Sequence, residues 1–233
     1  MKIELKKNSL AHLDHCWIIG NGPSLEYTSL CLLKGEITIG FNGIGNIFEP
    51  TYYCLINKQL FEPYNKPFVE AMQQCKNTTF VITDNIEPCS WMERYHIVKR
   101  SHDVVAIHER FAPDFKVTYR RGTTLGELGI PLANYLGIKT IYMIGVDATL
   151  SGPNNLSFHG LMTKNEKERT FTKKEREREH DTTAKMIDHI KVLYEREGGK
   201  IYDCTYDPNR TIGWQFFKKR DYYETIDNIR NAK

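Results

Sequence analysis

Short, unbroken apolar runs that each end in a glycine or a polar residue constrain the fold of this chain more than any other feature. The clearest spans residues 141–147 and closes on a single carboxylate, and similar runs occupy residues 16–19, 37–41, 51–56, 78–83 and 200–204. Runs of this length are typical of strands buried on both faces, as in a parallel sheet. Segments suited to helices lie between them, at residues 25–34, 66–76, 122–136 and 182–197. We therefore predict a single Rossmann-like α/β domain over residues 1–233, with a mostly parallel sheet flanked by helices.

Three segments do not follow this pattern. Residues 85–120 show no clear period, and we predict mixed structure there. Residues 150–180 form a polar excursion, in which positions 164–179 hold seven basic and five acidic residues. Such a run suits either a solvated helix or a lid over an active site, and the sequence leaves both open. Residues 211–233 form a C-terminal tail of aromatic and basic residues, for which core packing is favoured over contact with a neighbouring subunit or a membrane surface.

Composition excludes several classes of protein. A net charge of +3 and a pI near 8.4 give no domain-wide basic field, so we expect no nucleic-acid partner. The six cysteines include no C-x-x-C pair, which favours reduced, buried thiols over a zinc site and is typical of a cytoplasmic protein. We see no signal peptide, and no apolar stretch approaches the roughly 20 residues that span a bilayer. A homo-oligomer remains open.

A glycine-rich turn, Gly20-Asn21-Gly22-Pro23-Ser24, follows the first predicted strand. Glycines after a buried strand allow another group to approach the backbone, and exposed N–H groups ahead of a helix favour an anion. Ser24 could cap that helix and contact a phosphate or a ribose. The motif is neither G-x-G-x-x-G nor the Walker loop, so a nucleotide site and a plain connecting turn stay equally open.

Further candidate residues lie where predicted strands end or helices begin. Asn42, Asn57 and Asp147 each follow a strand, and ligands of parallel sheets bind at that edge. Each alone is more often a turn residue. Gly122-Thr123-Thr124 opens the helix that contains Gly126, directly after Arg120 and Arg121. This arrangement suits either a phosphate site or a threonine-capped helix with solvated arginines.

His180 is the histidine that we select as a candidate general base. It lies between the charged run and the helix predicted from residue 182, where a mobile loop could bring it to a substrate near neutral pH. A surface histidine without function is the alternative. The chain contains no Asp-x-Asp pair, which argues against a metal-held sugar nucleotide, so we predict no metal site.

The order of these motifs resembles glycosyltransferase family 42, the bacterial sialyltransferases, and a related group of uncharacterised glycosyltransferase-like and flagellin-glycosylation proteins. The similarity covers residues 16–204, and it is best in the opening motif and in residues 136–147. It continues through Phe41-Asn42, Ile56-Asn57 and Thr124-Leu125-Gly126 to His180. Residues 148–153 lack the two tyrosines that the family has there, and Leu125 replaces a serine.

The resemblance implies transfer of a CMP-activated nonulosonic acid, such as sialic acid, to a cell-surface glycan acceptor, with inversion and without an obligatory metal. By position, the residues that would contact the donor are Gly20, Asn21, Gly22, Ser24, Asn42, Asn57, Thr124 and Gly126, with Asp147 closing the neighbouring strand. His180 would deprotonate the acceptor hydroxyl. Such an enzyme would work in the cytoplasm or at the cytoplasmic face of the membrane. Two alternatives remain: a 6-hydroxymethyl-dihydropterin pyrophosphokinase-like enzyme using Mg²⁺ and ATP, and a non-catalytic nucleotide-binding protein.

Overall fold

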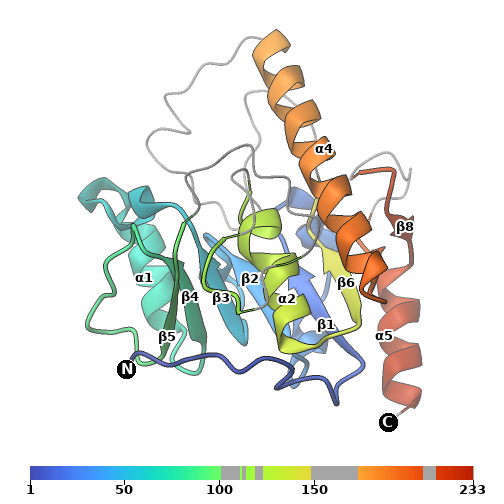
Figure 1. Cartoon of the computed structure of the whole chain (residues 1–233), viewed down its shortest axis with the longest axis horizontal. Helices are drawn as coiled ribbons and strands as arrows, with labels where there is room; N and C mark the ends of the chain where they lie inside the picture. Colours follow the sequence, from blue (N-terminus) through green and yellow to red (C-terminus); the bar gives the residue numbers. More distant parts are fainter. Residues whose placement is uncertain (101–110, 112–113, 119–122, 148–172, 207–213, 233) are drawn as a thin grey trace.

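The computed structural model describes residues 1–100, 111, 114–118, 123–147, 173–206 and 214–232, and of residues 173–180 it describes the backbone alone. Its centre is a parallel eight-stranded sheet in the order β5-β4-β3-β2-β1-β6-β7-β8 (Figure 1). The strands are β1 (His15–Ile19), β2 (Thr38–Phe41), β3 (Tyr52–Leu55), β4 (Thr79–Thr83), β5 (Tyr95–Val98), β6 (Thr140–Ile144), β7 (Lys200–Asp203) and β8 (Lys218–Lys219). The predicted α/β class with a parallel sheet is confirmed.

Alternate side chains of each central strand enter two separate cores, one on each face of the sheet. In β1, Cys16 and Ile18 enter the first core, whereas Trp17 and Ile19 enter the second. The π-helical turn η6 (Leu125–Gly129), α2 (Ile130–Leu136) and α4 (Lys173–Arg196) cover the first face. The second face is covered by α1 (Lys66–Gln74), α5 (Tyr222–Asn231) and the 3₁₀ turns η1 (Pro23–Tyr27), η2 (Leu30–Leu33), η3 (Ile44–Asn46) and η4 (Lys58–Phe61). A fifth 3₁₀ turn, η5 (Pro63–Asn65), directly precedes α1.

The predicted helices match the structure unevenly. The helix predicted at residues 66–76 is present as α1, but the one predicted at 25–34 is wrong, because η1 and η2 occupy that segment. The helix predicted at 122–136 begins at Thr124 and has π geometry over Leu125–Gly129, the turn that precedes Pro131 in α2. A proline ring clashes with the carbonyl four residues earlier in a regular α-helix, and the wider π turn lies at that position. Strands β5 and β8 and helix α5 were not predicted.

The charged run before His180 is helical where the structure describes it. Helix α4 begins at Lys173, so the prediction of a helix starting at residue 182, with His180 on a loop before it, is wrong. Glu, Lys and Arg are strong helix formers, and opposite charges three or four positions apart stabilise the turns. Residues 150–172 of the predicted lid lie outside the described residues.

The C-terminal tail folds back onto the start of the chain. Trp214, Phe217, Tyr222 and Ile226 are buried, so the core packing favoured for this tail is confirmed. In α5, the Tyr222 hydroxyl donates to the Ser29 carbonyl at 2.9 Å. The Tyr223 hydroxyl reaches the Tyr27 carbonyl (3.0 Å), and the Arg230 guanidinium reaches the Leu32 carbonyl (3.0 Å). Helix α5 therefore holds the segment that follows the glycine-rich turn.

All six cysteines are free thiols, and four of them, Cys16, Cys54, Cys75 and Cys204, are buried as predicted. Cys31 is exposed and Cys89 is half-buried, so burial does not extend to every thiol. Within the described ranges, no helix combines the length and the apolar character needed to cross a bilayer.

Candidate functional site

The strand order reverses between β1 and β6. From β1 the chain proceeds through β2, β3, β4 and β5 in one direction, whereas β6, β7 and β8 lie on the other side. In parallel α/β sheets, the ligand crevice lies outside the carboxyl ends of the two strands at such a reversal, and in this sheet that position is at the ends of β1 and β6. The predicted site residues Gly20, Asn21, Gly22, Ser24 and Asp147 lie there.

The glycine-rich turn is hydrogen-bonded to the exit of β6. The Gly20 N–H donates to the Ile144 carbonyl at 2.8 Å, and the Gly22 N–H donates to the Gly145 carbonyl at 2.8 Å. The Ser24 N–H donates to Asp147 Oδ2 at 2.9 Å, and the Ser24 hydroxyl donates to Asp147 Oδ1. Ser24 and Asp147 are only 4% and 6% exposed, so this charge-assisted pair is shielded from water.

The glycines are needed because the β6 exit comes so close. A Cβ placed on Gly22 would lie within 2.6 Å of all three atoms of the Asp147 carboxyl group. The φ of Gly22 is −68°, which any residue adopts, so it is space and not backbone freedom that requires glycine. The group that approaches this turn is thus part of the chain itself.

This geometry corrects one expectation. The N–H groups of Gly20, Gly22 and Ser24 were expected to be exposed to an anion, but all three donate to the β6 exit. Nor does Ser24 cap the turn, because Gly22 is the N-cap of η1. The side chain of Asn21, in the middle of the turn, differs from these groups. Its Oδ1 is buried and accepts no hydrogen bond from any residue that the structure describes.

Asn42 and Asn57 lie at the same edge of the sheet, after β2 and β3. Asn42 has a left-handed backbone (φ 48°), and its carbonyl accepts the Tyr53 hydroxyl. The Asn57 Oδ1 accepts the Gln59 N–H at 3.0 Å and caps η4. Neighbouring strands are about 4.8 Å apart, so Asn42 and Asn57 follow strands about 5 and 10 Å from β1. Asn57 therefore has a turn role whether or not it binds a ligand.

Thr124 and Gly126 lie at the start of the helix, under α4. The Thr123 hydroxyl accepts the Gly126 N–H at 3.2 Å, so Thr123 is the capping residue. Thr124 is buried, and a Cβ on Gly126 would lie 2.9 Å from Ile190 Cδ1 on α4. Gly126 allows the two helices to pack closely. His180 lies in the N-terminal part of α4, of which only the backbone is described.

A buried ion pair at this edge was missed from the sequence. Glu127 is 0% exposed and accepts two hydrogen bonds from Arg100, from Nε and Nη2, each 3.1 Å long. Arg100 Nη1 also lies 3.4 Å from the Ile56 carbonyl at the end of β3. Glu127 could have been found from the sequence, because it is a single charged residue in an otherwise apolar predicted helix. Arg100 could not, because it lies in residues 85–120, which show no hydrophobic periodicity. The pair fixes the π-helical turn to the exit of β3.

The described residues contain no group of three or more His, Cys, Asp or Glu side chains that could hold a metal ion. At the crevice, the Asp147 carboxylate is instead hydrogen-bonded to Ser24.

Comparison with known proteins adds one structural similarity. No family model matches the chain, and no curated protein matches it. A solved structure described as the MAf glycosyltransferase from Magnetospirillum magneticum AMB-1 superposes with a TM-score of 0.60 at 14% sequence identity. The match covers 98% of this chain and 38% of that one, so the chain spans well under half the length of the protein it resembles. The chain thus shares the fold of part of that protein.

Proposed function

We propose that this chain is a glycosyltransferase that takes a nucleotide-activated sugar into the crevice between β1 and β6. The observation that carries the proposal is the buried, unsatisfied Oδ1 of Asn21, at the point of the sheet where α/β proteins bind ligands. The similarity of fold to a glycosyltransferase supports the class of reaction.

In this proposal, Asn21 accepts a hydrogen bond from the nucleotide. An amide oxygen accepts and cannot donate, so its partner would be a ribose hydroxyl or an exocyclic amine of the base. The donor is a CMP-linked nonulosonic acid, which the resemblance to the sialyltransferases favours. Asn42, Asn57 and Thr124 would line the rest of the donor site, while Gly20, Gly22, Ser24 and Asp147 hold the turn in place.

The proposed reaction is a single displacement. His180 takes the proton of an acceptor hydroxyl, the hydroxyl oxygen attacks the anomeric carbon, and the bond to the nucleotide phosphate breaks with its electron pair. The configuration is inverted, the products are the lengthened cell-surface glycan and CMP, and no metal is required. The reaction would take place in the cytoplasm or at the inner face of the membrane.

Nucleotide binding tests the proposal directly. Thermal shift and calorimetric titration with CMP, CDP, UDP and ATP should identify one nucleotide that stabilises the fold. Asn21→Ala should weaken that binding by about tenfold without lowering stability, because Oδ1 bonds no described residue. Asn77→Ala is the matched control, since Asn77 is an exposed asparagine ahead of β4, at the opposite edge. If none of the four nucleotides binds, the proposal is wrong.

Activity separates the alternatives. Release of CMP from a CMP-sugar, lost in His180→Ala and unchanged by EDTA, would support the sialyltransferase-like mechanism. Pyrophosphoryl transfer from Mg²⁺-ATP to a pterin would instead indicate the pyrophosphokinase. Nucleotide binding without turnover would indicate a non-catalytic protein.

A further inference from the structure

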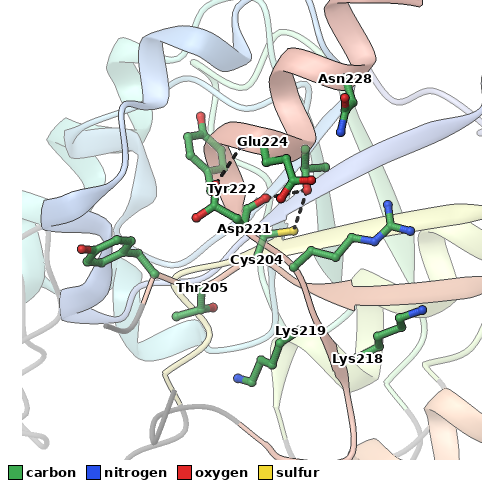
Figure 2. Close-up of a pocket in the computed structure, with 11 residues that line it drawn as sticks. Cys204, Thr205, Lys218, Lys219, Asp221, Tyr222, Glu224 and Asn228 are labelled. Carbon is green, nitrogen blue, oxygen red and sulfur yellow. Dashed lines mark hydrogen bonds between the residues drawn. The ribbon is translucent and has the colours of Figure 1, made fainter. Parts of the chain in front are cut away.

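A cavity of about 660 Å³ lies beside the crevice, at the edge of the sheet formed by β7 and β8 (Figure 2). Its walls are the residues after β7, the strand β8 and the first turns of α5. Figure 2 shows Asp221 and Glu224 on the α5 side and Lys218 and Lys219 on the β8 side. This volume is in the range that holds one small ligand such as a sugar.

The cations of the cavity differ in what they already bind. Lys219 is paired with the buried carboxylate of Asp203. Lys218 and Arg220 form no ion pair with any described residue, and both are exposed. The Arg220 guanidinium carbon lies 3.8 Å from the centre of the Tyr202 ring, and Lys218 Nζ lies 6.0 Å from it. The Tyr202 ring thus holds two positive charges at one wall, where an anion would be attracted.

The opposite wall offers groups of the other kind. Glu224 and Asn228 lie one turn apart on α5 and present oxygen acceptors for hydroxyl groups. Tyr206, which also lines the cavity, packs against Tyr27 with 5.4 Å between ring centres and provides an apolar face for a sugar ring. A ligand with hydroxyls and an anionic group would match both walls. A bare anion would match only one.

One wall of the cavity contacts the residues that follow β6. Thr205, a lining residue, accepts the Val146 N–H at the exit of β6 on its hydroxyl at 3.2 Å. Tyr27 belongs to η1, the turn that follows Gly22. A substrate could therefore extend from the crevice into the cavity over the width of one or two strands, about 5–10 Å. The N–H groups of Gly20, Gly22 and Ser24 already donate to the residues after β6, whereas Lys218 and Arg220 in this cavity are cations suited to a negative charge.

We propose that the cavity between β7, β8 and α5 is an anionic-sugar subsite, in which Lys218 and Arg220 bind a phosphate or carboxylate of the substrate. Its role as a substrate subsite rests on the proposed glycosyl transfer, whereas its binding chemistry does not. The anionic group can come from the donor or from an acidic acceptor.

Binding of glucose 1-phosphate, measured by calorimetry at low ionic strength, tests the binding chemistry alone. The doubly substituted Lys218→Gln, Arg220→Gln protein should bind it about tenfold or more weakly. Arg220→Lys keeps the charge but not the planar group stacked on Tyr202, so it should lose less affinity than the double variant. Lys200→Gln is the control, because Lys200 is an exposed cation at the other end of β7. Lys218 and Arg220 are both exposed, so circular dichroism should show an unchanged fold in the double variant. Equal affinity of the double variant and the wild type, or no binding to either, would overturn the proposal.

Two further titrations identify the source of the anion. If the donor supplies it, the double variant should bind a CMP-sugar more weakly but CMP alone as before. If the acceptor supplies it, donor affinity should be unchanged and the KM for an acidic acceptor should rise. Either result supports the subsite. Failure of the nucleotide panel with retained glucose 1-phosphate binding would reject the proposed function and leave the subsite standing.

Discussion

Replacing Gly22 with alanine should destabilise the protein through one neighbour, the carboxyl group of Asp147. The new Cβ would lie within 2.6 Å of this group, so the carboxylate must move and release the Ser24 N–H and hydroxyl. Hydrogen bonds to a charged group contribute about 1.5–3 kcal/mol each, so we expect Gly22→Ala to lower the free energy of unfolding by about 3 kcal/mol. For a domain of this size, each kcal/mol lowers Tm by about 2–4 °C.

Urea titration of a double-mutant cycle checks the origin of this loss. In an Asp147→Ala background the clash is gone, so Gly22→Ala should cost less than about 1 kcal/mol there. Gly35→Ala serves as the comparison, because Gly35 has nothing within 4 Å and a φ of +87°, and should show only a left-handed penalty of about 1–2 kcal/mol. An equal cost of Gly22→Ala with and without Asp147 would refute the steric argument.

Three further measurements address other parts of the structure. Arg100→Met removes two hydrogen bonds to the buried carboxylate of Glu127 and should lower the free energy of unfolding, measured by urea titration, by about 3 kcal/mol. A loss below about 1 kcal/mol would show that this ion pair does not stabilise the fold. Gly126→Ala should lower the free energy of unfolding by about 1–3 kcal/mol in the wild type, because the new methyl group would clash with Ile190. In an Ile190→Ala background the loss should be smaller. Equal losses in the two backgrounds would contradict this close packing of the two helices. A thiol reagent at pH 8 should modify exposed Cys31 quickly and the four buried thiols only on unfolding, because burial raises the pKa of each buried thiol and lowers its thiolate fraction. Cys31→Ser should remove the fast phase of the reaction. A buried thiol that reacted as fast as Cys31 would contradict this prediction.

The strands that could be predicted from the sequence are those that contain a short apolar run of their own. β6 is buried along most of its length, and its apolar run needs no knowledge of its neighbours. β8 consists of two lysines at the edge of the sheet, and it becomes a strand only by pairing with β7. Helix α5 had a local signal that was overlooked. Asp221 followed three residues later by Glu224 is a capping pattern, and the Asp221 side chain does accept the Glu224 N–H at 2.9 Å.

Some features of the candidate site could likewise be predicted from local sequence, and others depend on contacts between distant residues. The position of Asn42, Asn57 and Asp147 at one edge follows from parallel strands, so their location could be predicted. The contact between Ser24 and Asp147 joins residues 123 positions apart, and no local pattern encodes it. His180 was expected on a loop because charge was taken as a sign of solvation. Glu, Lys and Arg are also good helix formers, and α4 includes residues 173–179 of the charged run.

The docking of α5 has a consequence for how the chain is made. Its contacts to Ser29, Tyr27 and Leu32 join residues separated by 193, 196 and 198 positions. Contacts of such long range slow folding, and here they cannot form until nearly all of these residues have left the ribosome. Until then, the Trp17 ring, which packs 5.4 Å from that of Tyr222, lacks its cover. The nascent chain should therefore carry an exposed apolar face, suited to a chaperone, that disappears in one late step.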